Sequence, residues 1–430
     1  MTKNTRGNPL ALLPLLVFVL LFLGTGIVAQ DFYAMPITVA VIIAIIAAML
    51  LKPKERLNDK IAVLTRGAGQ ENIMLMVIIF LLAGAFSQVA ENMGAVDSTV
   101  NFGLAFLPSS LLLVGLFVIS CFISISMGTS TGTVAALVPI AVGIAGQTDL
   151  ALALTVATVI GGAMFGDNLS IISDTTIVST QSQEVKMVDK FKTNFLIVLP
   201  GAIITMIILW FISSGQSATA GSDGGYSLLK VLPYLLVLII ALSGVNVLLV
   251  LLSGIVFAGI VGLADGSYTV TSLIAAAGEG IGNMQEIAVI TILIGGLIAL
   301  IQHYGGIDYL LHFITDRIHT RRGAEFGIAT LVSVTDLSTA NNTISIIITG
   351  PLARDIADEY GVDRKKSASI LDIFASAFQG IIPYGAQMLA AAGLASISPI
   401  ALIPFAIYPA MLLISGLIAI AIGFPKKLNS

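Results

Sequence analysis

The chain has 430 residues, of which 57% are apolar and only 10% are charged, and its formal net charge is −4. Soluble domains carry about 25% charged residues, so this chain lacks the charge to cover a water-exposed surface, and lipid is its expected solvent. The acidic balance argues against a nucleic-acid partner. The single cysteine excludes a disulfide framework, and the three histidines are not spaced as a zinc site.

Eight apolar runs are predicted to cross the bilayer, for which a helix needs about 20 residues. They are Pro9–Val28, Met35–Leu51, Ile73–Val89, Asn194–Ser213, Leu228–Ser243, Val245–Leu263, Ile287–Ile301 and Ile400–Gly423. The first run has some features of a signal peptide, but the second half of the chain repeats its pattern, so we expect a spanning helix. Two further apolar stretches, Ser109–Ser182 and Gly323–Ser396, are interrupted by Gly, Ser, Thr, Asn and Asp.

The two halves of the chain resemble each other. Gly94–Asp97 matches Gly305–Asp308 at an offset of 211 residues, and Ser126–Thr131 matches Ser338–Thr343 at an offset of 212. Because the matches keep their order and a nearly constant offset, they indicate an internal duplication.

The basic residues predict the orientation, since short loops rich in Lys and Arg stay on the cytoplasmic side. The expected cytoplasmic residues are those of Lys52–Arg66, Lys186, Lys190, Lys192, Arg317, Arg321, Arg322, Arg354, Arg364, Lys365, Lys366, Lys426 and Lys427. Four loops without basic residues are expected outside: Gln30–Ala34, Glu91–Pro108, Ser214–Ser227 and Asp265–Glu286. Of the 20 basic residues, this arrangement leaves only Lys230 outside.

The loops fall on these predicted sides of the membrane only if the interrupted stretches include re-entrant hairpins and broken helices. The expected hairpins are 109–149 and 323–359, and the expected broken helices are 150–181 and 367–396. Five crossings in each half would invert the second half relative to the first. We therefore expect an all-α polytopic membrane protein with inverted repeats at 1–214 and 228–430 and an external linker at 215–227. Both termini would be cytoplasmic, and the expected location is the bacterial inner membrane.

Two polar segments of the first half are candidates for an ion or substrate site. Non-helical backbone at membrane depth is tolerated where it lines a cavity, and broken helices of inverted repeats bind ions and substrates at the midplane. The first segment, Ser126–Thr133, offers the hydroxyls of Ser126, Thr129, Ser130 and Thr131. The same small residues could instead form a helix interface.

The second segment, Gly166–Thr176, carries two acids. A buried acid costs about 2.5–3.5 kcal/mol on insertion scales, which favours a functional role for Asp167 and Asp174. The candidate residues are Asp167, Asn168, Ser170, Ser173, Asp174 and Thr175. Their oxygens suit a hard cation such as Na+, whereas Ser173 or Asp174 could alternatively cap the next helix.

The second half contributes two more polar segments. In Thr335–Thr343 the candidates are Asp336, Ser338, Asn341, Asn342 and Thr343. Amides can bind a cation through oxygen or a carboxylate through nitrogen, and Asp336 could instead cap a helix. The fourth segment offers Gln379, Tyr384 and Gln387, preceded by Asp372, which could be a relay or an interfacial charge.

The run Gly166–Thr176 resembles the Gly-Asp-x-x-Ser-x-x-Ser-Asp-Thr-Thr signature of the NhaC-type Na+/H+ antiporter family. The resemblance implies the inverted-repeat fold of the ion transporter superfamily and a site at Asp167, Ser170, Ser173, Asp174 and Thr175. Family members typically have Lys and Pro where this chain has Asn168 and Ile171, so the resemblance alone does not fix the ion.

The sequence therefore predicts a secondary active transporter, and no enzyme, that exchanges Na+ for H+ by alternating access. Na+ and protons would compete for Asp167 and Asp174, with no cofactor and no transition metal, and a homodimer is compatible with this interpretation. The alternative is a Na+- or H+-coupled transporter of a small amino acid or organic carboxylate. A passive channel or a membrane scaffold would explain the buried acids and broken helices less well.

Overall fold

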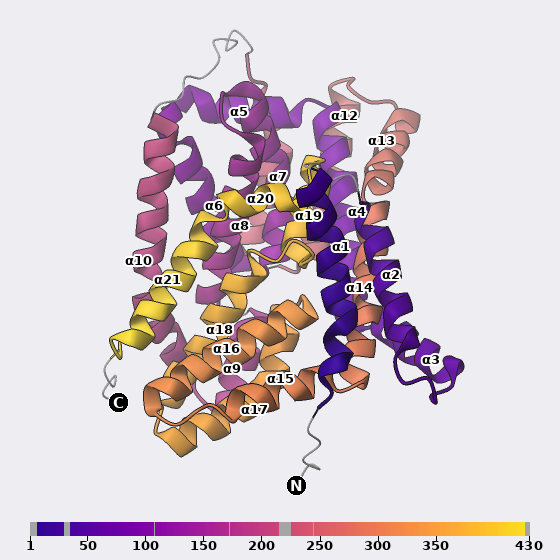
Figure 1. Cartoon of the computed structure of the whole chain (residues 1–430). Helices are drawn as coiled ribbons and strands as arrows, with labels where there is room; N and C mark the ends of the chain where they lie inside the picture. Colours follow the sequence, from indigo (N-terminus) through magenta and orange to yellow (C-terminus); the bar gives the residue numbers. More distant parts are fainter. Residues whose placement is uncertain are drawn as a thin grey trace.

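A computed structural model describes residues 7–29, 35–106, 108–171, 173–214, 225–243 and 245–425. The elements in these ranges are all helical, as predicted (Figure 1). The loop Gln30–Ala34, most of the predicted linker 215–227 and the tail Lys426–Lys427 lie outside the described residues.

The described residues form helices in the following order. In the first half they are η1 (Pro9–Leu12), α1 (Leu13–Ala29), α2 (Ile37–Leu50), α3 (Leu57–Ala68), α4 (Glu71–Asn92), α5 (Ala95–Phe106), η2 (Ser109–Leu111), α6 (Leu112–Met127), α7 (Ser130–Gln147), α8 (Leu152–Leu169), α9 (Asp174–Gln183) and α10 (Met187–Ser214). In the second half they are α11 (Leu228–Leu242), α12 (Val247–Ala264), α13 (Val270–Asn283), α14 (Gln285–His303), α15 (Gly306–Thr315), α16 (Arg321–Thr339), α17 (Asn342–Tyr360), α18 (Arg364–Gln379), α19 (Ala386–Ala395), α20 (Pro399–Leu402), η3 (Ile403–Phe405) and α21 (Ile407–Ala421).

Helices that can cross a membrane dominate the described residues. Six helical runs are long and apolar enough, and a seventh is reached if α19 and Pro399–Phe405, which meet at 102°, form one span. Large apolar side chains such as Ile239 and Val256 are more than half exposed, at 65% and 61%. An apolar exterior of this kind is unfavourable in water and stable in lipid, where it has no contact with water. The chain is an integral membrane protein.

Three segments predicted as loops contain helices. Lys52–Arg66 overlaps α3, Glu91–Pro108 contains α5, and Asp265–Glu286 contains α13. In α13 a glycine allows close packing: a Cβ on Gly280 would lie 2.2 Å from the carbonyl oxygen of Gly84 in α4. Small residues let membrane helices approach in this way.

The predicted span Ile400–Gly423 is not one continuous helix. Helix α20 begins with Pro399, Pro404 interrupts the run within η3, and α21 starts only at Ile407. Because proline lacks a backbone N–H, it favours the first turn of a helix and breaks a continuous one.

Three lysines expected in cytoplasmic loops have buried side chains. Lys60 is 3% exposed and donates to the carbonyl oxygens of Met49 at 2.8 Å and Leu51 at 2.5 Å, at the end of α2. Lys190 is 1% exposed and Lys366 is 4% exposed. A lysine ammonium at a helix C-terminus stabilises carbonyls that have no helical partner, so a cation can be buried near the end of a span.

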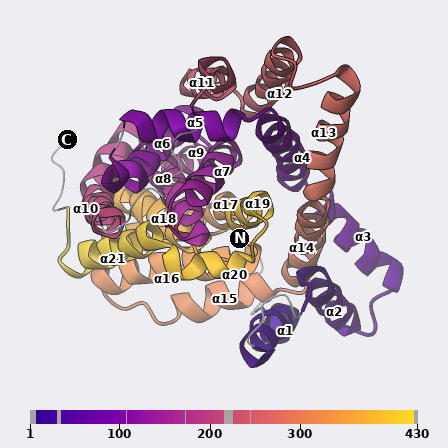
Figure 2. The ribbon, with the colours of Figure 1, turned by 90° about the horizontal axis from the view of Figure 1, so that it is seen from above.

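The helices divide into two regions when the molecule is seen from above (Figure 2). Helices α1, α2, α3, α13 and α14 lie along one side, and α6–α10 with α16–α18 and α21 form the denser region. Helix α4 lies between the two, where it packs against α7, α13 and α14. Four helix breaks, α6/α7, α8/α9, α16/α17 and α18/α19, fall in or beside the denser region.

Candidate functional site

The break between α6 and α7 is built by a glycine and a capping threonine. Helix α6 is followed by Gly128, which adopts the left-handed conformation with φ +68°, a conformation that costs glycine little. Thr129 is extended and its hydroxyl accepts a hydrogen bond from the amide of Gly132 at 3.3 Å. The turn therefore presents Ser130 and Thr131 in the first turn of α7.

The break between α16 and α17 has the same local form. Ala340 is left-handed with φ +51°, and Asn341 is extended and accepts from the amide of Ile344 at 3.0 Å. The side-chain oxygen of Asn342 accepts from the amide of Thr343 at 3.0 Å. Its buried side-chain nitrogen has no hydrogen-bond partner, so this amide is available to a ligand.

The break between α8 and α9 carries the two acids. Ser173 is the cap of α9: its hydroxyl accepts from the amide of Thr176 at 3.3 Å and donates to the carbonyl oxygen of Asp167 at 3.1 Å. Capping thus explains Ser173 but not Asp174, the first residue of α9. The two acids differ in environment, because Asp167 is 4% exposed and Asp174 is exposed.

These breaks meet at one pocket of about 70 Å³. It is lined by Leu75, Met76, Ile79, Gly128, Thr129, Ser130, Thr131, Asp167, Asp174, Thr175, Asn341, Asn342, Thr343 and Gln387. Ten of these are candidates chosen from the sequence, and they come from four interrupted segments in both halves. Sequence reasoning missed the apolar wall from α4, whose residues look like any spanning helix.

A line of hydrogen bonds joins the two halves at this pocket. Ser130 donates to a carboxylate oxygen of Asp167 at 3.0 Å and accepts from the side-chain nitrogen of Gln387 at 3.0 Å. Gln379 donates to Gln387 at 2.7 Å and to the carbonyl oxygen of Ala340 at 3.3 Å. The orientation of the Asp167 carboxylate is therefore coupled to α18 and α19.

Close packing against α6 fixes the position of the α8 segment that carries Asp167. A Cβ on Gly166 would lie 2.3 Å from the Cβ of Ser124 in α6, so only glycine permits this approach. The hydroxyl of Ser124 donates to the carbonyl oxygen of Ala163 at 2.6 Å, and Ser170 donates to the carbonyl oxygen of Ile125 at 2.7 Å. Helix α6 thus holds both ends of the segment that carries Asp167.

Four other candidates lie away from the pocket. Ser338 donates to the carbonyl oxygen of Val334 within its own helix, Tyr384 donates to that of Leu337 at 2.7 Å, and Ser126 is partly buried. Asp336 is fully buried, and neither carboxylate oxygen has a hydrogen-bond partner. The suggested capping role of Asp336 is wrong, because Asn341 caps α17.

Asn168 and Asp372 belong to a second buried cluster. Asn168 donates to a carboxylate oxygen of Asp372 at 3.1 Å, and Lys190 pairs with the same oxygen at 2.8 Å. Asn194 donates to it at 2.7 Å. Asp372 is 0% exposed, so it is not an exposed interfacial charge. Sequence reasoning missed Lys190 and Asn194, although their spacing of four residues puts them on one helix face.

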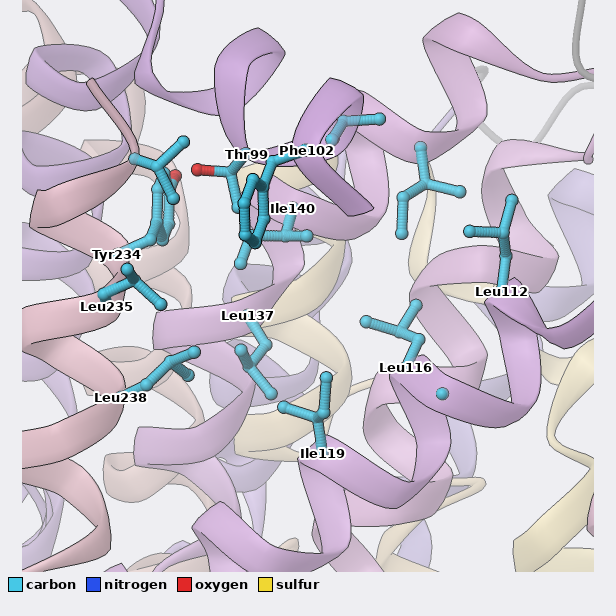
Figure 3. Close-up of a pocket in the computed structure, with 14 residues that line it drawn as sticks. Thr99, Phe102, Leu112, Leu116, Ile119, Leu137, Ile140, Tyr234, Leu235 and Leu238 are labelled. Carbon is cyan, nitrogen blue, oxygen red and sulfur yellow. The ribbon is translucent and has the colours of Figure 1, made fainter. Parts of the chain in front are cut away.

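A larger pocket of about 360 Å³ lies between α5, α6, α7 and α11. Figure 3 shows that aliphatic and aromatic side chains such as Phe102, Leu116 and Leu238 line it. None of the described residues that line it is acidic or basic, so it offers no ligand set for a cation.

Comparison with known proteins assigns the chain to a family. The model of the Na+/H+ antiporter family matches residues 9–213 and 226–425. The chain is 28% identical to the Na+/H+ antiporter NhaC of Bacillus subtilis (strain 168), over 84% of this chain and 85% of the relative. It is 21% identical to the malate-2H+/Na+-lactate antiporter of the same organism, over 89% of each.

Among solved structures, the Alcanivorax borkumensis YdaH transporter matches 97% of this chain and 99% of its own, with 13% identity and a TM-score of 0.42. The family match covers most of the chain and agrees with the resemblance carried by Gly166–Thr176. The chain belongs to the Na+/H+ antiporter family.

Proposed function

We propose that this protein exchanges Na+ for H+ at the pocket that contains Asp167 and Asp174, by alternating access. The observation that carries the proposal is the burial of the Asp167 carboxylate at a pocket lined by hydroxyl- and amide-bearing side chains from both halves of the chain. Oxygen ligands suit hard cations, and a carboxyl group at membrane depth is stable only when it is protonated or paired with a cation. Na+ and H+ are therefore competing ligands of one carboxylate.

The size and charge of the pocket favour an ion over an organic substrate. Its volume of about 70 Å³ is small beside the roughly 300 Å³ at which pockets for organic ligands begin. Its described lining residues include two acids and no Lys or Arg. A malate- or lactate-like carboxylate would meet repulsion there, so the carboxylate and amino-acid alternatives are disfavoured.

We also propose the inverted-repeat arrangement of 1–214 and 228–430, with hairpins at 109–149 and 323–359. Matched backbone conformations support it: Gly94 and Gly305 are both left-handed just before α5 and α15, and Gly128 and Ala340 are both left-handed at helix breaks. The N-terminal end of α1 and the C-terminal end of α21 both lie on the lower side of Figure 1. This arrangement fits an even number of crossings. Cytoplasmic termini in a bacterial inner membrane complete this proposal.

Purified protein in liposomes provides the test. An inward Na+ gradient should drive H+ outward and raise the internal pH, read by a trapped dye, and Asp167→Asn should abolish the change. Radiolabelled malate, lactate and amino acids, tested in the same vesicles, separate the alternatives. Na+-driven uptake of one of these solutes without a pH change would refute the proposed exchange.

A further inference from the structure

The ammonium of Lys190 lies within a group of oxygens at the break between α8 and α9. Its side chain is 1% exposed. The nitrogen is 2.8 Å from a carboxylate oxygen of Asp372 in α18, 2.9 Å from the carbonyl oxygen of Asn168 in α8 and 2.6 Å from the hydroxyl of Thr176 in α9. A carboxylate, a carbonyl and a hydroxyl around one positive centre form the ligand set of a hard cation.

The helix break supplies these oxygens. Asn168 is in the last turn of α8, where carbonyl groups lack helical partners. Asn194 donates to that carbonyl at 2.9 Å and to the Asp372 carboxylate at 2.7 Å, which fixes both. The second carboxylate oxygen of Asp372 and the side-chain oxygen of Asn168 are buried without a hydrogen-bond partner. The cluster therefore contains two more oxygens that could bind a cation.

The other buried lysines have simpler surroundings. In the described residues, Lys366 has a 2.6 Å contact with a carboxylate oxygen of Glu325, and Lys60 donates to two carbonyl oxygens at the end of α2. Lys190 differs because three kinds of oxygen from three helices surround it. An ion pair formed only for stability would not need oxygens from a broken helix.

We propose that Lys190 is a tethered cation, whose ammonium fills a second cation site formed by Asn168, Thr176 and Asp372. The site takes Na+ when the ammonium is removed. Because the chain itself neutralises Asp372, exchangeable cations are confined to the Asp167 pocket. That consequence for exchange rests on the proposed function, whereas the cation site itself does not.

The test is Lys190→Met, which keeps the apolar stem and removes the charge. Binding of radioactive Na+ to purified protein should rise by one ion per chain relative to the unmodified protein. Na+ should also raise the Tm of the variant, measured against choline, by more than it raises the Tm of the unmodified protein. An unchanged number of bound Na+ in folded Lys190→Met would overturn the proposal.

Lys366→Met is the matched control, because it also breaks a buried ion pair. It should lose stability without gaining a Na+ ion, and a gain there would contradict a cation site specific to the surroundings of Lys190. Lys190→Met combined with Asp372→Asn removes the charge of the site and should fold without Na+ and gain no ion. If Lys190→Met is unfolded, Na+ in the purification buffer should restore it, and failure of that rescue while the double variant folds contradicts the proposal.

The Asp167→Asn background separates this proposal from the proposed function. Asp167→Asn should remove the Na+ ion of the pocket, and adding Lys190→Met should still supply one ion. Loss of the added ion alone contradicts the Lys190 site, whereas Na+ binding that is unaffected by Asp167→Asn contradicts the exchange site.

Discussion

Replacing Ser130 with alanine removes the hydroxyl that lies between Asp167 and Gln387. That hydroxyl donates to the Asp167 carboxylate and accepts from Gln387, both at 3.0 Å, and Ser130 is 3% exposed. The donated bond stabilises the ionised carboxylate, the form that binds Na+, more than the protonated form. Ser130→Ala should therefore shift the competition at Asp167 toward the proton.

The size of the shift follows from the kind of hydrogen bond that is lost. Hydrogen bonds to charged groups contribute about 1.5–3 kcal/mol, and 1.4 kcal/mol corresponds to about a tenfold change in an equilibrium constant. At fixed pH, the Na+ concentration for half-maximal exchange should rise by roughly tenfold to a hundredfold. Raising the pH should reduce the difference in this Na+ concentration between the variant and the unmodified protein, since fewer protons then compete for the carboxylate.

The assay is Na+-dependent pH change in liposomes, measured over a range of Na+ concentrations at two pH values. Ser120→Ala is the matched control: Ser120 is fully buried, and its hydroxyl donates at 2.7 Å to the carbonyl oxygen of Leu116 in the same helix. It should leave the Na+ dependence unchanged. A Na+ concentration for half-maximal exchange by Ser130→Ala that stays within twofold of that of the unmodified protein at both pH values would refute this role of the hydroxyl.

Three further predictions concern the pocket and the topology. Asp174→Asn should abolish cation-dependent transport without loss of folded protein, because Asp174 lies in the pocket and caps no helix; full transport would remove it from the site. Asn342→Asp should keep Na+ binding with a shifted pH dependence if this residue supplies an oxygen to the cation, and joint loss of binding and folding would indicate a structural role. Single cysteines at Gln147 and Ser182 in a Cys121→Ser background should be labelled from opposite sides of the membrane, Gln147 from outside. Cytoplasmic labelling at Gln147 would rule out the inverted arrangement.

The sequence by itself predicts that this is a membrane protein and where its helices break, because both properties depend on local composition. A chain with 10% charged residues cannot cover a soluble surface. Polar clusters such as Ser126–Thr133 and Gly166–Thr176 stand out against apolar surroundings, and hydrogen-bonding groups at membrane depth need partners. Helix breaks at Gly128 and Ser173 fall inside these clusters.

The tertiary structure alone decided which polar groups meet. Asn168 and Asp372 are 204 positions apart and share a hydrogen bond, and neither position predicts the other. The charge of Lys190 predicts a position in a water-exposed loop, whereas packing places its ammonium among oxygens of α8, α9 and α18. Local sequence determines where a helix must break, because the backbone responds to its own residues. It does not determine which distant carboxylate lies opposite the break, because that depends on how the helices of both halves pack.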